Sequence, residues 1–254
     1  MKEYEIYNED CLEGMKRIAN GSVDAIICDP PYGHSTDCDW DIRLPLEEMW
    51  EQFNRVTKQN AAIVLFSQLP FAVDLINANR KMYRYEWIWS KSLAVGFFNA
   101  NKMPLRAHES ILVFYRRLPT YNPQWREGKA YERKHESMEG GRVYRKRNAN
   151  ITVNDGKHYY PRDVIKFTSV QSLHKTEPRY HPTQKPLALM EFLVRTYTNE
   201  GELILDATCG SGTTRLAAVS CGRRFIGFEK EKNFYDISRM RIEKALAKKA
   251  QELF

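Results

Sequence analysis

One succession of elements near the end of the chain limits the folds that the chain can adopt. It consists of an apolar strand, a glycine loop, a helix and a second strand. Residues 203–205 form an apolar run that predicts a buried strand. Gly210 and Gly212 then permit a tight turn, and residues 213–220 have the pattern of a helix. Residues 225–228 predict the next strand. The succession predicts one βαβ unit of a parallel sheet.

The same alternation runs through the first 115 residues and resumes after about residue 176. Apolar runs predict further strands at 4–7, 24–28, 61–66, 85–89 and 110–115. Apolar residues at helical spacing predict helices at 11–18, 46–56, 71–79, 187–197 and 234–249. We therefore expect an α/β fold, with a doubly wound, mostly parallel sheet.

The tetrapeptide Asp29-Pro30-Pro31-Tyr32 follows the apolar run at 23–28. Two adjacent prolines fix φ twice and give no N–H to a ladder or a helix, so the segment is a stiff loop at the end of a buried strand. The loop offers a carboxylate, a carbonyl and an aromatic face. That set suits an amino group on a flat ring, although a plain strand-terminating turn is the alternative for Pro-Pro alone.

Two acids frame the glycine loop. Asp206 ends the strand before it, and Glu229 ends the strand after it, 23 positions later. An acid at about this distance holds ribose hydroxyls in doubly wound sheets, so we expect a nucleoside-containing cofactor. An ordinary strand–helix turn is the alternative. No Gly-Lys-Ser/Thr follows, which excludes a phosphate-loop NTPase, and Arg215 stands where a nicotinamide enzyme has its third glycine.

Between about 116 and 176 the periodicity is lost and the chain becomes basic. Between residues 116 and 147 there are ten Lys and Arg residues and only four Glu residues, which gives this stretch a net charge of +6. The aromatic residues Tyr121, Trp125, Tyr131 and Tyr144 lie among them. A nucleic-acid-facing insertion fits both the charge and the aromatics, and a solvated loop is the alternative. The chain, with net charge +7, thus divides into 1–115, 116–176 and 177–254.

Several classes of protein are disfavoured. No apolar stretch approaches 18 residues, and the N-terminus lacks the pattern of a signal peptide. Five cysteines without regular spacing indicate reduced thiols, so we expect a cytoplasmic protein without a membrane partner. His34, Cys38 and Asp39 have no second ligand pair, so no metal site is predicted.

Taken together, these motifs resemble the S-adenosylmethionine-dependent DNA amino-methyltransferases in their β arrangement, in which the catalytic motif comes first and the cofactor glycine loop last. The matching segments are Asp29-Pro30-Pro31-Tyr32, Arg106-Ala107-His108-Glu109, His181-Pro182-Thr183-Gln184-Lys185-Pro186, Asp206 to Thr214, and Glu229. The resemblance implies a Rossmann-like methyltransferase fold with permuted motif order, in which 1–115 is the catalytic half, 116–176 the DNA target-recognition region and 177–254 the cofactor-binding half.

The resemblance also implies the site. The catalytic residues would be Asp29, Pro30, Pro31 and Tyr32. The residues around S-adenosylmethionine would be Asp10, Cys11, Asp29, His181, Thr183, Gln184, Lys185, Asp206, Thr208, Gly210, Ser211, Gly212, Thr213, Thr214, Glu229 and Lys230. Asp10 is equally explained as a helix N-cap, and Lys185 as a solvated lysine. Phe97, Phe98, Asn99, Asn101 and Lys102 form a loop that could approach DNA.

The implied reaction is methylation of the 6-amino group of a flipped-out adenine in double-stranded DNA. Cytosine 4-amino methylation is the alternative, but that type more often has Ser in place of Asp29. RNA and protein-glutamine enzymes often have Asn there. The family loop has Pro and Phe where this chain has Ala207 and Thr208, which predicts weaker cofactor binding and leaves open a DNA-binding relative with little catalysis. A homodimer and a cognate restriction endonuclease are also left open.

Overall fold

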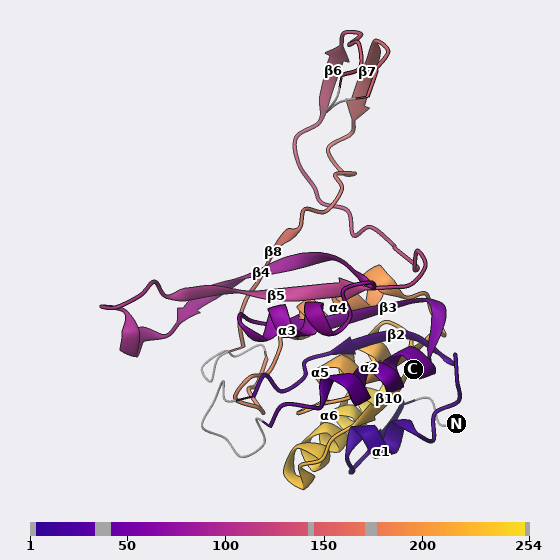
Figure 1. The fold of residues 1–254 in the computed structure, drawn as a ribbon, viewed down its shortest axis with the longest axis vertical. Coiled ribbons are helices and arrows are strands. Elements are labelled where there is room, and N and C mark those ends of the chain that lie inside the picture. Colours follow the sequence, from indigo (N-terminus) through magenta and orange to yellow (C-terminus); the bar gives the residue numbers. More distant parts are fainter. Residues whose placement is uncertain (1–3, 34–41, 142–144, 171–176, 252–254) are drawn as a thin grey trace. The chain divides into compact units, whose positions relative to one another are not determined.

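The computed structural model describes residues 4–33, 42–141, 145–170 and 177–251 (Figure 1). The chain forms two compact units. The main unit runs up to Asn122 and resumes at Asp163, and the small unit is Pro123–Arg162. The small unit lies within the predicted insertion at 116–176. The two units are described separately below.

The main unit is built on one sheet of eight strands among the described residues, in the order β1-β10-β9-β2-β3-β5-β4-β8. The neighbours pair in parallel except for β5, which is antiparallel to β3 and β4. The predicted mostly parallel sheet is therefore confirmed. The strands are β1 (Tyr4–Tyr7), β2 (Val23–Cys28), β3 (Thr57–Ser67), β4 (Tyr83–Val95), β5 (Arg106–Phe114), β8 (Val164–Phe167), β9 (Leu203–Asp206) and β10 (Arg224–Phe228).

Helices cover both faces of this sheet, which makes it doubly wound. The first three helices pack on one face with buried residues such as Met15, Phe53 and Leu75. The last three pack on the other face with residues such as Leu193 and Ala217. The helices are α1 (Cys11–Met15), α2 (Leu46–Val56), α3 (Phe71–Ala78), α4 (Leu187–Tyr197), α5 (Thr213–Ser220) and α6 (Lys232–Gln251), with a short 3-10 turn η1 (Phe97–Asn99).

The order of the sheet reverses between β9 and β2. From β2 the chain passes through α2 to β3 on one side, and from β9 it passes through α5 to β10 on the other. Segments far apart in sequence thereby meet: α1, indigo in Figure 1, lies beside the yellow β10. Open α/β sheets bind ligands at the carboxyl ends of the strands where the order reverses, so the fold itself marks this edge.

The small unit is a two-stranded antiparallel ribbon of β6 (Tyr131–His135) and β7 (Asn150–Asn154). A bridge between Arg126 and Tyr159 and the contact of Trp125 with Tyr160, with ring centroids 4.7 Å apart, close its base. Neither strand was predicted from the sequence: β6 is mostly charged, and the alternating Ile151 and Val153 of β7 are exposed rather than buried. The predicted insertion also contains β8, which belongs to the sheet of the main unit.

No helix in the described ranges combines the length and the apolar character needed to cross a membrane. Four cysteines lie in the described parts of the chain, and all four are buried free thiols: Cys11, Cys28, Cys209 and Cys221. They contribute to the core rather than to disulfide bonds.

Candidate active site

A pocket of about 420 Å³ opens at the edge of the sheet where the strand order reverses. Every predicted site residue lines it except Gly212. The pocket is also lined by residues outside the predicted site list, namely Glu9, Leu12, Ile42, Arg43, Leu44, Pro45, Glu109, Met190, Ala207, Cys209, Phe228, Glu231 and Phe234. Two halves of the chain thus share one cavity, as the resemblance implies.

The Asp29-Pro30-Pro31-Tyr32 loop follows β2, and contacts of Tyr32 hold it in place. The Tyr32 hydroxyl donates to Asp29 Oδ1 at 3.0 Å, and the Tyr32 ring stacks on Phe71 with centroids 5.3 Å apart. Burial raises the pKa of Asp29 above its ordinary value, although the neighbouring Lys185 favours the ionised form. The ionisation of Asp29 therefore depends on the ammonium of Lys185.

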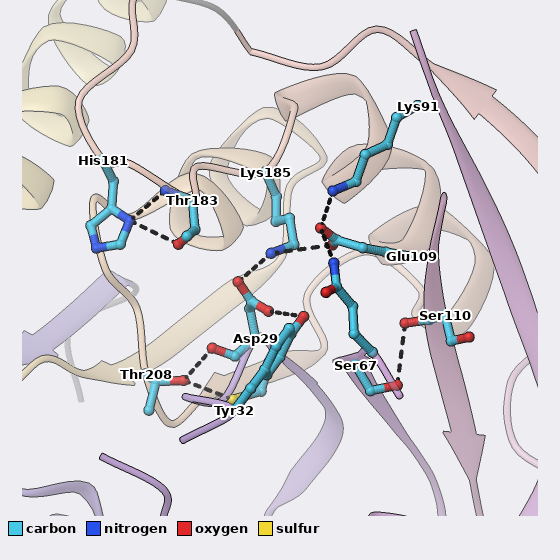
Figure 2. Close-up of polar contacts among 12 residues, drawn as sticks. Asp29, Tyr32, Ser67, Lys91, Glu109, Ser110, His181, Thr183, Lys185 and Thr208 are labelled. Atoms are coloured by element: carbon cyan, nitrogen blue, oxygen red, sulfur yellow. Dashed lines mark hydrogen bonds and ion pairs between the residues drawn. The ribbon is translucent and has the colours of Figure 1, made fainter. Parts of the chain in front are cut away.

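Lys185 is not a solvated lysine. Its side chain is only 8% exposed, and its ammonium forms an ion pair with Asp29 Oδ2 (Figure 2). On its other side, Nζ lies 3.5 Å from Glu109 Oε2, and Glu109 is paired in turn with Lys91. Glu109 and Lys91 were missed as site residues. For Glu109 the available signal was its place in the matching segment Arg106-Ala107-His108-Glu109.

The glycine loop after β9 is tied to the acid after β10. Gly210 donates its N–H to Glu229 Oε2 at 2.7 Å, and the N–H of Glu231 donates to Oε1 at 2.8 Å. Gly210 has φ of +50°, and a Cβ built there would meet nothing closer than the His181 ring at 3.8 Å. The backbone of Gly210 is therefore open to a ligand in the pocket.

Gly212 lies at the end of the glycine loop where α5 begins. It does not line the pocket; it caps α5 with φ of +81°. A Cβ there would lie 2.1 Å from the Ser238 hydroxyl on α6. The second glycine of the loop thus allows α6 to pack closely.

Thr208 joins the two functional loops. Its hydroxyl donates to the Asp29 carbonyl at 2.9 Å and lies 3.1 Å from Cys28 Sγ, while its N–H donates to Asp206 Oδ1 at 3.1 Å (Figure 2). The residue that departs from the family pattern therefore connects the glycine loop to the catalytic loop.

The remaining predicted residues give the pocket its polarity. Burial raises the pKa of Asp206 to about 7 and also raises the pKa of Glu229. Burial lowers the pKa of His181 to about 4, so its ring, 4.1 Å from that of Phe234, is neutral at pH 7. Asp10 lines the pocket and caps α1 by accepting from Leu12 N at 2.9 Å.

These donors and acceptors fit S-adenosylmethionine. Carboxylates at Asp206 and Glu229 can accept hydrogen bonds from hydroxyl and amino groups and attract a cation, and the open Gly210 leaves room beside the backbone. By contrast, the described ranges contain no cluster of three His, Cys, Asp or Glu residues that could hold a metal. His34, Cys38 and Asp39 lie outside those ranges.

Known proteins share both the sequence and the fold. The M2.MboI type II methyltransferase of Moraxella bovis is 26% identical over 94% of this chain and 88% of its own length. The DNA adenine methyltransferase YhdJ of Escherichia coli is 29% identical over 98% of this chain and 85% of its own length.

Solved structures agree with these relatives. The M1.HpyAVI–SAM complex superposes with a TM-score of 0.62 at 26% identity, covering 94% of this chain and 98% of that one. The cytosine-N4-specific PvuII DNA methyltransferase has a TM-score of 0.67, covering 95% and 86%, but at 16% identity it shows the fold alone. The N6/N4 methyltransferase family model, described as DNA methylase, matches residues 23–240. With most of its length matched, this chain belongs to the N6/N4 DNA methylase family.

Proposed function

We propose that this protein transfers a methyl group from S-adenosylmethionine to the 6-amino group of adenine in duplex DNA. The observation that carries the proposal is the Thr208–Asp29 hydrogen bond, which joins the glycine loop to the Asp-Pro-Pro-Tyr loop at the mouth of one pocket. Family membership, the adenine methyltransferase relative and the S-adenosylmethionine-bound neighbour support it.

The roles of the residues follow from their chemistry. A paired base hides its amino group, so the target adenine must leave the helix and enter the pocket. Asp29 and the Pro30 carbonyl can then each accept one N–H of the amine, which turns the nitrogen lone pair toward the methyl donor. S-adenosylmethionine supplies the electrophilic methyl group when bound. Asp29 takes up the proton that the amine releases once it is alkylated.

The other predicted residues hold the two reactants. We assign Glu229 and Asp206 to accept hydrogen bonds from the hydroxyl and amino groups of the cofactor. The backbone at Gly210 lets the cofactor approach the glycine loop closely. Tyr32 is fixed by Phe71 and lines the pocket, and we assign it to stack on the flipped base. Pro31 keeps that loop rigid. The remaining lining residues shape the cofactor pocket: Asp10, Cys11, His181, Thr183, Gln184, Ser211, Thr213, Thr214 and Lys230.

Adenine is favoured over cytosine as the target. The first position of the catalytic motif is Asp29, and the family's cytosine enzymes more often have Ser there. YhdJ, a relative over nearly the whole chain, is named an adenine methyltransferase, whereas the cytosine-specific PvuII enzyme is similar in fold alone. Digestion of methylated DNA to nucleosides separates the two products.

We assign DNA recognition to the region 116–176, and within it to the small unit. Its strand β6 carries exposed cations at Arg133 and Lys134, and a two-stranded ribbon fits the major groove of DNA. In the main unit the turn η1 extends from β4, with Phe97 68% exposed and Phe98 fully exposed. With Lys102 close by, this turn is a second DNA-facing candidate.

Three further expectations concern the setting of the enzyme. Relatives named type II methyltransferases support a cognate restriction endonuclease, for which protection of plasmid DNA from cleavage is the test. A homodimer is an expectation that analytical ultracentrifugation decides. Buried free thiols such as Cys28 and Cys209 support a reducing compartment, the cytoplasm.

The decisive experiment uses tritiated S-adenosylmethionine and duplex DNA, followed by digestion to nucleosides. We expect methyladenine with the wild type and a loss of about 100-fold or more in Asp29→Ala, because the amine loses its acceptor. Asp236→Ala, which changes an exposed carboxylate on α6, is the control and should keep the wild-type rate. Absence of methyladenine with the wild type, or full activity in Asp29→Ala, would overturn the assignment.

The runner-up is a DNA-binding relative with little catalysis. Calorimetry with S-adenosylmethionine distinguishes it, since such a protein would bind DNA but show no heat of cofactor binding at millimolar concentration. The open backbone at Gly210 and the acids of the pocket favour binding.

A further inference from the structure

A row of four alternating charges runs from β4 into the active site. Lys91 on β4 pairs with Glu109 on β5, Glu109 faces Lys185 before α4, and Lys185 pairs with Asp29 after β2 (Figure 2). The side chains of Lys91, Glu109 and Lys185 are 11%, 9% and 8% exposed, so water screens them little. Two positive and two negative charges leave the row neutral.

Glu109 holds the middle of this row. Its Oε1 accepts from the Lys91 ammonium and from Gln68 Nε2 at 3.3 Å. Its Oε2 lies 3.5 Å from Lys185 Nζ and accepts no hydrogen bond within the described parts of the chain. Oε2 therefore interacts with the Lys185 ammonium through charge rather than through a hydrogen bond, and the same ammonium binds Asp29 directly.

We propose that Glu109 is a positioning residue for methyl transfer: its carboxylate shares the Lys185 ammonium with Asp29 and thereby limits how strongly that ammonium holds the Asp29 carboxylate, which must accept the amine of the base. This inference rests on the proposed function. Lys185 also lies 5.0 Å from the centre of the Phe66 ring, so the ammonium is fixed among two carboxylates and a ring face.

The balance of charges around Asp29 sets the direction of the effect. Besides Lys185, Asp29 faces Tyr32 of its own loop, Glu109 of β5 and, across the pocket, Asp206 of β9. Burial raises the pKa of Asp29, the Lys185 ammonium lowers it, and the negative charge of Glu109 raises it. Removal of the Glu109 charge therefore lowers the pKa of Asp29.

The variant Glu109→Gln tests the proposal. Without its second carboxylate, the Lys185 ammonium binds Asp29 more strongly and competes with the amine, so we expect kcat to fall about ten- to hundredfold. The acid limb of the kcat profile moves to lower pH, and the Kd for S-adenosylmethionine stays near that of the wild type. Glu109→Asp keeps the charge at a greater distance and should retain more activity than Glu109→Gln.

A double variant separates positioning from simple charge imbalance. Glu109→Gln leaves one cation unbalanced, whereas Lys91→Met with Glu109→Gln restores neutrality and still removes the anchor of Lys185. We expect the double variant to regain stability but to keep the low kcat and the shifted acid limb. Asp24→Asn is the control, because Asp24 is an ion-paired carboxylate at the far end of β2, and it should leave both readouts unchanged.

A measurement without substrate distinguishes a failure of this inference from a failure of the proposed function. The carboxyl carbon resonance of Asp29, identified by its loss in Asp29→Asn, gives the titration midpoint in the cofactor-free protein. The midpoint should fall in Glu109→Gln. An unmoved midpoint, or full recovery of kcat in the double variant, would overturn the role of Glu109. Absence of methyladenine with the wild type would count against the proposed function alone.

Discussion

Thr208 stands at a position where the family resemblance implies an aromatic residue, and its hydroxyl has a partner that an aromatic ring could not provide. It donates to the carbonyl of Asp29, immediately before the two prolines. Because Pro30 and Pro31 have no N–H, the loop has few backbone donors of its own to fix it. The hydroxyl of Thr208 thus supplies a contact that orients the catalytic loop.

We expect Thr208→Val, which keeps the shape but removes the hydroxyl, to lower kcat. The loss of one neutral hydrogen bond is about 1 kcal/mol, or roughly a fivefold loss of rate if the bond acts fully in the transition state. Thr208→Ser should keep the wild-type rate. Single-turnover kinetics measure the chemical step, and calorimetry should show an unchanged Kd for S-adenosylmethionine.

Thr196→Val is the matched control, since Thr196 is a buried threonine on α4 whose hydroxyl bonds to the Phe192 carbonyl at 2.7 Å. It should alter stability without altering the rate. If Thr208→Val and wild type transfer methyl groups equally fast, the link between the loops has no part in catalysis.

At the scale of the element, α6 supports the glycine loop through its buried side chains. Arg241 on α6 is buried and donates to the Ser211 carbonyl at 2.7 Å and to Thr213 Oγ1 at 3.2 Å. Ser238, one turn earlier, occupies the space that a side chain at Gly212 would need. The helix therefore supports the glycine loop from behind, while Gly210 faces the pocket.

The two glycines should consequently fail in different ways when replaced by alanine. Both have positive φ, so both variants carry backbone strain of about 1–3 kcal/mol. Gly212→Ala adds a clash with Ser238 and should lose clearly more stability in urea unfolding. Gly210→Ala places its methyl group toward the pocket and should weaken cofactor binding more than it lowers stability. Equal losses of affinity in the two variants would contradict this division.

At the scale of the whole molecule, one pocket gathers acids from strands far apart in sequence. Asp29 follows β2, Asp206 ends β9 and Glu229 follows β10, and burial raises the pKa of all three. An acid whose pKa is higher in the folded than in the unfolded protein holds a proton that unfolding releases. These carboxyls therefore make the free energy of unfolding fall as the pH rises through the interval between the two pKa values.

Asp206 gives the clearest case. Its folded pKa of about 7 exceeds the unfolded value of about 3.9, so the cofactor-free protein loses up to about 4 kcal/mol between pH 4 and pH 7 through this group. Asp206→Asn should remove that part of the slope and be more stable than the wild type at pH 8. Urea unfolding at pH 5, 6.5 and 8 measures how the free energy of unfolding depends on pH in the wild type and in Asp206→Asn. Parallel curves would show that Asp206 ionises normally in the folded protein.

The sequence by itself determined the alternation of strands and helices, the two functional loops and their order. Glycine, proline and the spacing of apolar residues act locally, so Asp29, Gly210 and Glu229 could be located without coordinates. The strands of the small unit were not located, because β6 is mostly charged and β7 offers only the two alternating apolar residues Ile151 and Val153, too short a pattern within a basic segment.

Only the tertiary structure decided which side chains meet across the pocket. Asp29 meets Lys185, which follows it by 156 positions, and the Asp29 carbonyl meets Thr208, which follows by 179. Gly212 turned out to serve the packing of α6, and Glu109 to face the active-site lysine. Such contacts depend on where the sheet reverses and how closely its helices pack. No local pattern of residues encodes those distances.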